Sequence, residues 1–131
     1  MKKLIISILF VSLISLGYSN SLYRPAVKAG NFLYISGQNA QSNNESLKNE
    51  DITQQTKKAI LLIEKTLKAH DYTLNDIVDV NVAIAKQKDF KDFNKEYKKY
   101  FTNKPARSTS LGVLHQNIGA LVEISAIAYK K

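Results

Sequence analysis

Residues 77–85 read Ile-Val-Asp-Val-Asn-Val-Ala-Ile-Ala, and residues 121–129 read Leu-Val-Glu-Ile-Ser-Ala-Ile-Ala-Tyr. In the first stretch apolar residues recur at every second position, which predicts a strand with Val78, Val80, Val82 and Ile84 on one side. The second stretch is apolar on both sides apart from one acidic residue, which predicts a strand that is buried on two faces.

The remaining elements are predicted outward from these two strands. The aromatic run 32–35 ends in Ser36-Gly37-Gln38 and forms a hairpin with residues 26–29. Asp51 and Gln54 form a capping box at the start of a helix that runs to about His70. Asp89 caps a second helix, which ends before Pro105. Residues 106–114 then form the strand that precedes 121–129 in sequence.

The predicted order is β-β-α-β-α-β-β. It predicts an α+β two-layer sandwich, in the α/β class, with a mixed sheet and both helices on one face. Because so many strand residues are apolar on both sides, we expect the other face to be covered by further copies of the chain.

The N-terminal stretch has the pattern of a secretory signal. Lys2 and Lys3 precede an uncharged run from Leu4 to Leu16, and small residues precede a cleavage point after Ser19. The run is short for a membrane-spanning helix, which needs roughly 20 residues. The sequence thus predicts a signal peptide at 1–19, a single domain at 20–131 and a periplasmic or secreted protein. An uncleaved membrane anchor is the alternative.

Composition excludes several kinds of site. The chain has no cysteine and only two histidines, His70 and His115, so neither a disulfide nor a thiolate metal site is possible and no metal site is expected. The formal net charge is +8. Lysines scattered over helix faces account for most of the basic residues, and no aromatic stacking platform accompanies them, so nucleic-acid binding is not expected.

Three polar residues stand where the pattern calls for apolar ones. Glu123 is the only charged residue in its strand, and a buried carboxylate with a raised pKa suits acid–base chemistry. The alternative is an edge strand with Glu123 in water.

Arg107 begins the preceding strand, and if the two strands are adjacent its planar guanidinium can face one cleft with Glu123 and bind a substrate carboxylate. A structural Arg–Glu ion pair is equally compatible. Asn94 interrupts the aromatic stripe of the second helix and is expected to brace a loop or a strand end.

Taken in order, several short motifs resemble the RidA branch of the Rid family, also called YjgF-like. They run from Tyr23 to Tyr129 and so cover nearly all of the chain after the signal. The motifs are Tyr23 with 26–31, Ser36-Gly37-Gln38, Asp51-Ile52 with Gln55-Thr56, Phe93-Asn94 with Tyr97, Pro105-Ala106-Arg107-Ser108, and 119–124 with 126–128.

The resemblance implies a chorismate-mutase-like fold and a homotrimer with a site in each cleft between subunits. It assigns carboxylate binding to Arg107 and the positioning or activation of water to Glu123. Tyr23, Ser36 and Thr109 then line the substrate pocket, and Gly37 and Asn94 support it. No cofactor is implied.

The reaction implied by the resemblance is the hydrolysis of reactive enamines and imines, such as 2-aminoacrylate, to 2-oxo acids and ammonia. The protein is then a 2-iminobutanoate/2-iminopropanoate deaminase, and its ligands are small 2-imino and 2-oxo acids. The alternative is a non-catalytic trimer that binds small carboxylates or proteins in the cell envelope. Membrane contact is expected only through the N-terminal segment, if it is not cleaved.

Overall fold

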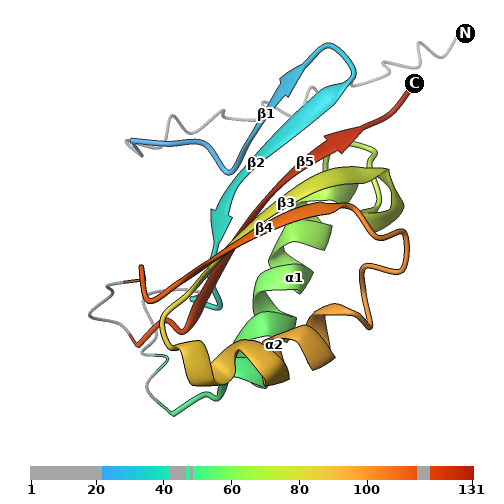
Figure 1. Ribbon diagram of the computed structural model, residues 1–131. Coiled ribbons are helices and arrows are strands. Elements are labelled where there is room, and N and C mark those ends of the chain that lie inside the picture. Colours follow the sequence, from blue (N-terminus) through green and yellow to red (C-terminus); the bar gives the residue numbers. More distant parts are fainter. Residues whose placement is uncertain (1–21, 42–46, 48, 115–118) are drawn as a thin grey trace, which may run out of the picture.

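The computed structural model describes residues 22–41, 47, 49–114 and 119–131 (Figure 1). The predicted signal at 1–19 and the predicted loop around His115 lie outside the described residues. The elements along the chain are β1 (Ala26–Ala29), β2 (Phe32–Gln38), α1 (Ile52–Lys68), η1 (Leu74–Asp76), β3 (Ile77–Ile84), η2 (Gln87–Asp89), α2 (Phe90–Tyr97), β4 (Ala106–Leu111) and β5 (Val122–Tyr129).

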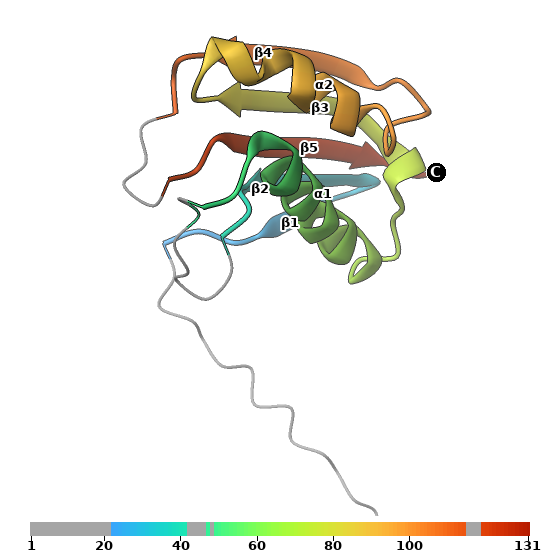
Figure 2. The same cartoon turned by 90° about the horizontal axis from the view of Figure 1, so that it is seen from below.

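The described strands form one five-stranded mixed sheet in the order β1-β2-β5-β3-β4. The pairs β1–β2, β2–β5 and β5–β3 are antiparallel, and β3–β4 is parallel. Both helices cover the same face of the sheet (Figures 1 and 2), with α1 against β5 and β2 and α2 toward β3 and β4. The predicted α+β sandwich and its order of elements are therefore confirmed.

The expected adjacency of β4 and β5 is wrong, because β3 lies between them. The physical reason is the helix between β3 and β4. A helical crossover returns the chain in its original direction, so β4 pairs with β3 in parallel, as in other β-α-β units. Strand β5 then pairs with β3 and β2 and becomes the central strand.

The two helices begin differently. At α1 the predicted capping box is present, since the Asp51 side chain accepts from the Gln54 backbone N–H and Gln54 accepts from that of Asp51. At α2 the expected cap is absent: Asp89 has helical backbone angles, closes the short helix η2, and makes no capping hydrogen bond. The second helix therefore begins as a continuation of a 3₁₀ turn.

A bulge in β3 changes one predicted orientation. The register with β5 shifts between Ile77 and Asp79, so that Ile77 is buried and Val78 is 44% exposed. Val80, Val82 and Ile84 point into the core as predicted. An extra residue in a strand turns the side chains that precede it to the opposite face of the sheet. The prediction from strict alternation therefore placed Val78 on the wrong face.

The face of the sheet opposite the helices divides into two parts. Over β1 and β2 it carries exposed apolar side chains, namely Val27, Phe32 and Tyr34. Over β3, β4 and β5 it carries mostly small polar ones, and a depression of about 190 Å³ there is lined by Asn81, Val82, Ala83, Ser108, Ser110, Val113, Glu123 and Ser125. In this chain the polar part of the open face is thus the part that holds the candidate carboxylate.

Candidate functional site

Glu123 lies on the central strand β5, on the face away from the helices. Its neighbours in sequence, Val122 and Ile124, are completely buried in the core, whereas Glu123 is partly exposed and opposes Ala83 in the register. The alternative of an edge strand is wrong, because β5 is paired on both sides. A carboxylate in this position remains accessible to a small ligand in the depression on the open face.

Gly37 leaves the space that the Glu123 carboxylate occupies. A Cβ built on Gly37 would lie 2.5 Å from Oε1 and 2.7 Å from Cδ of Glu123. The register of β2 against β5 shifts between Ile35 and Gln38, which places Gly37 in an irregular segment of the strand. Gly37 therefore supports the site by lacking a side chain where Glu123 needs room.

Arg107 lies on the edge strand β4 and on the helix side of the sheet. It is paired with Val80, a core residue, and its guanidinium carbon is 4.8 Å from the ring centre of Tyr97 and 5.6 Å from that of Phe93. Burial raises the pKa of Tyr97 to about 12, with the Arg107 charge acting to lower it and Asp79 to raise it. Tyr97 is therefore a neutral phenol beside a cation at physiological pH.

Within one chain Arg107 and Glu123 do not share a cleft. They point to opposite faces, and the register places Glu123 level with Ser110, three residues beyond Arg107. Two strand spacings and three residues amount to roughly 10 Å in each direction. The expected single-chain cleft is wrong, and so is the alternative of an Arg107–Glu123 ion pair within one chain.

Ser36 is hydrogen-bonded to the segment that precedes β1, and this segment contains Tyr23. The Ser36 hydroxyl donates to the Arg24 carbonyl oxygen at 2.5 Å, and its backbone N–H donates to the Pro25 carbonyl oxygen at 3.0 Å. Tyr23, next to the anchored residue, is 68% exposed. In the single chain Ser36 thus holds the segment that carries Tyr23, and the Tyr23 ring extends from the surface.

Asn94 and Thr109 lie on the helix side, near Arg107. Asn94 lines a groove of about 370 Å³ between α2 and β4 together with Tyr97 and Arg107. Its side chain makes no hydrogen bond to any residue that the structure describes, so the expected bracing of a loop is not observed. Thr109 follows Arg107 on the same side of β4, is paired with Val82, and is partly buried.

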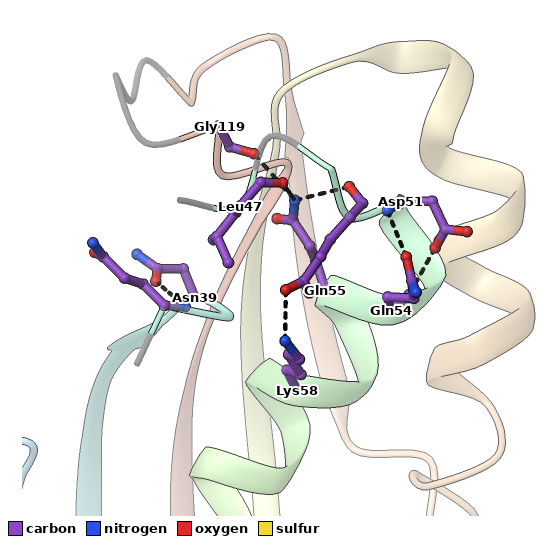
Figure 3. A network of polar contacts seen from close by, with 9 residues as sticks. Asn39, Leu47, Asp51, Gln54, Gln55, Lys58 and Gly119 are labelled. Atoms are coloured by element: carbon purple, nitrogen blue, oxygen red, sulfur yellow. Dashed lines mark hydrogen bonds and ion pairs between the residues drawn. The ribbon is translucent and has the colours of Figure 1, made fainter. Parts of the chain in front are cut away.

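Gln55 is a supporting residue that sequence reasoning did not single out. It is completely buried, and its Nε2 donates to the carbonyl oxygens of Leu47, Glu50 and Gly119 at 3.1–3.2 Å (Figure 3). Its Oε1 accepts from the Leu121 backbone N–H at 2.8 Å, two residues before Glu123. A signal existed, because Gln55 falls on the apolar stripe of α1 between Ile52 and Ala59.

The described ranges also bear on metal binding and on membrane crossing. No group of three or more His, Asp or Glu side chains that could hold a metal ion is found there. The imidazole Nδ1 of His70 lies 2.9 Å from the Thr66 carbonyl oxygen. In the same ranges no helix is long and apolar enough to cross a membrane.

Comparison with known proteins yields one family. The family model described as endoribonuclease L-PSP matches residues 18–130. A RutC family protein of Pyrococcus horikoshii is 39% identical over 111 residues, covering 83% of this chain and 87% of that protein. The mitochondrial protein MMF1 of Saccharomyces cerevisiae is 34% identical over 110 residues, covering 83% and 75%.

Solved structures agree with this result. A putative endoribonuclease of Thermotoga maritima has a TM-score of 0.78 and 30% identity, and a Yersinia pestis protein of the Rid family has a TM-score of 0.77 and 31% identity. Each match covers 86% of this chain and 90% of the other. The chain therefore belongs to the endoribonuclease L-PSP family, the family of the Rid and YjgF proteins.

Proposed function

We propose that this protein is a cofactor-independent deaminase that hydrolyses small 2-imino and enamino acids, such as 2-aminoacrylate and 2-iminobutanoate, to 2-oxo acids and ammonia. The observation that carries the proposal is the Glu123 carboxylate. It lies on the central strand, against a glycine, in a depression of about 190 Å³ lined mostly by small side chains. That space is sufficient for a short acid and a water molecule.

The proposed site is completed by a second copy of the chain. Arg107 lies on an edge strand with one free side, and Glu123 lies on an open face next to exposed apolar side chains. In a homotrimer the edge of one subunit can approach the open face of the next, which brings the guanidinium of one chain to the carboxylate of another. The opposite orientations of the two side chains within a chain support this arrangement.

In the proposed mechanism the substrate enamine first tautomerises to the imine, whose C2 is electrophilic. Arg107 binds the substrate carboxylate through two hydrogen bonds and so fixes C2 beside a water molecule held by Glu123. The water oxygen forms a bond to C2 while Glu123 accepts a proton, and a carbinolamine results. Glu123 returns its proton to nitrogen, and the C–N bond then breaks as the C=O bond forms and the carbinolamine hydroxyl passes its proton to Glu123, so that ammonia and the 2-oxo acid are released.

The test is a deaminase assay on the purified protein with several imino acids generated in situ. Arg107→Lys keeps the charge but loses the two-point geometry, so activity should fall severely while the assembly persists. Glu123→Gln should lower kcat by about 10²–10⁴-fold, with a much smaller change in pyruvate affinity. Folded variants with parental activity would refute the site.

The same assay separates two other functions. Binding of pyruvate without turnover by the parent protein would indicate a non-catalytic carboxylate-binding trimer. Endonucleolytic cleavage of RNA, the activity named in the description of the family model, is measured on the same preparation. RNA cleavage without deamination would refute the proposed function.

Export is part of the proposal and rests on the Lys2-Lys3 and Leu4 to Leu16 pattern. It places the deaminase in the periplasm or outside the cell. Intact-mass analysis of the protein from its native host should give a mature chain that begins near Asn20. A full-length product in the cytoplasm would contradict export.

A further inference from the structure

The Arg107 guanidinium packs against a row of aromatic rings. Phe93, Tyr97 and Phe101 are spaced four residues apart, so their rings lie on one side of the helical segment. The Tyr97 and Phe101 rings are stacked with centres 4.2 Å apart and planes 17° apart, and the Phe93 and Tyr97 centres are 5.5 Å apart. Tyr97 is the central ring and the one nearest to Arg107.

The Tyr97 ring has little freedom to move. Tyr97 is 7% exposed, and its two aromatic neighbours are 0% and 4% exposed. Its hydroxyl is buried and has no hydrogen-bond partner among the described residues. Among the described residues, the contacts that Tyr97 makes are therefore those of its ring.

Arg107, in contrast, is an exposed side chain on an edge strand. It forms no ion pair with any residue the structure describes, and its two ring contacts are the interactions that restrain the guanidinium. Stacking on a ring occupies the flat face of a guanidinium and leaves the N–H groups at its edge free to donate. Lys98 and Lys104 line the same groove, and none of its lining residues is acidic. The lining of the groove therefore contributes positive charge and no carboxylate.

We propose that Tyr97 is a positioning residue for carboxylate binding: its ring holds the Arg107 guanidinium in one plane, so that the edge of the guanidinium is presented to a small 2-imino or 2-oxo acid. This inference rests on the proposed function. It assigns to Tyr97 a role in substrate affinity rather than in the chemical step, because Tyr97 acts through Arg107 and touches no reacting atom.

The test compares Tyr97→Leu with the conservative variant Tyr97→Phe. Loss of the ring should raise KM for the imino acid and the dissociation constant for pyruvate about five- to tenfold, with kcat within about twofold of the parent. Tyr97→Phe keeps the ring and should restore most of the affinity. Leu67→Ala, a core variant in α1 remote from Arg107, shows the effect of a cavity alone and should leave KM near the parental value.

Nuclear magnetic resonance gives a readout that does not depend on activity. The chain has only two arginines, so Arg24→Lys assigns the Arg107 side-chain signals directly. In the parent protein the ring currents of Tyr97 should shift the Arg107 δ-methylene protons upfield. The shift should disappear in Tyr97→Leu and persist in Tyr97→Phe.

The outcomes distinguish this inference from the proposed function. An unshifted Arg107 in the parent, or a folded Tyr97→Leu variant with parental KM and pyruvate affinity, would overturn the role of Tyr97 even if the protein is an active deaminase. A parent that binds pyruvate without deaminating any imine would refute the proposed function, and pyruvate affinity would then decide the role of Tyr97. A parent that does neither would refute both.

Discussion

At the scale of single residues, the position of the Glu123 carboxylate depends on the absence of a side chain at Gly37. The Cβ of any other residue would come within 3 Å of three atoms of the Glu123 side chain. The Gly37 backbone does not have a positive φ, so alanine is compatible with the chain conformation there. A side chain at residue 37 therefore acts on the position of Glu123 more than on the backbone.

We predict that Gly37→Ala lowers kcat/KM for imine hydrolysis by about tenfold or more, because the methyl group displaces the carboxylate and a small displacement of a catalytic group is costly. The melting temperature should change little, since the Glu123 side chain is the part that moves. A double-mutant cycle is the control: in a Glu123→Ala background Gly37→Ala should cost nothing further. Equal losses in both backgrounds would show that Gly37 acts independently of Glu123.

At the scale of elements, α1 is tied to the segment that leads into β5 by one buried side chain. The Gln55 side-chain amide forms hydrogen bonds with Leu47 and Glu50, which precede α1, and with Gly119 and Leu121, which precede β5 (Figure 3). Without it, the partly buried Leu121 N–H and the Glu50 and Gly119 carbonyl oxygens would lose the side-chain partner that the structure gives them, while the Leu47 carbonyl would still accept from the Glu50 N–H.

Gln55→Leu, a change of similar size, should therefore lower the free energy of unfolding by about 3 kcal/mol and reduce turnover through the segment that carries Glu123. Thr56→Val is the matched control. Thr56 is equally buried, but its hydroxyl has no partner among the described residues, so its replacement should change stability by less than about 1 kcal/mol. Urea unfolding at one fixed protein concentration measures both. Equal losses for the two variants would contradict the special role of the amide.

The contact between the helices contains the buried carboxylate of Glu96, whose contribution to the stability of the protein depends on pH. The Lys99 hydrogen bond lowers the pKa of Glu96 below 4.5, burial opposes this, and the Tyr100 hydroxyl, which donates to Glu96, lowers it further. A carboxyl group with a lowered folded-state pKa stabilises the protein above its unfolded pKa. That contribution is lost as the pH falls through the folded pKa.

Glu96→Gln should therefore destabilise the protein by about 1–3 kcal/mol at pH 7, and the difference from the parent should shrink as the pH falls below about 4.5. Glu64→Gln serves as the control, because its ion pair with Lys68 is solvent-exposed and should contribute less than about 0.5 kcal/mol. Thermal unfolding from pH 7 to pH 3 measures the effect. A difference that stays constant over this range would contradict the assignment.

At the scale of the whole molecule, the open face of the sheet indicates self-association. Tyr34 and Val27 are each 47% exposed on that face, and Phe32 is 40% exposed, which is unusual for contiguous apolar residues on the surface of a monomer. We expect light scattering of the purified protein to give three subunits.

Tyr34→Lys places a charge on this face and should dissociate the trimer and abolish activity. Leu61→Lys is the control: Leu61 has a similar exposure, 44%, but lies on α1, on the other side of the molecule, and the trimer should persist. A parent protein that remains a monomer at micromolar concentration would exclude a site shared between subunits.

Some features of this protein are determined locally, and the sequence alone predicted them. The capping box at Asp51, the hairpin of residues 26–29 with 32–35 and the strand at 121–129 depend on residues a few positions apart, and each predicted element is present. Arg107 and Glu123 were recognisable for the same reason, since each interrupts a local pattern of apolar or lysine residues.

Other features depend on contacts between distant segments, and only the tertiary structure decided them. The sequence does not encode locally that β5 lies between β2 and β3; the parallel crossover through α2 produces that order. The strand order places Gly37 against Glu123, the pairing register places Arg107 and Glu123 on opposite faces, and the packing of α2 places the Tyr97 ring against Arg107. These relationships arise from the packing of separate elements whose residues lie 10 to 86 positions apart in the sequence, and a pattern of neighbouring residues carries no information about such packing.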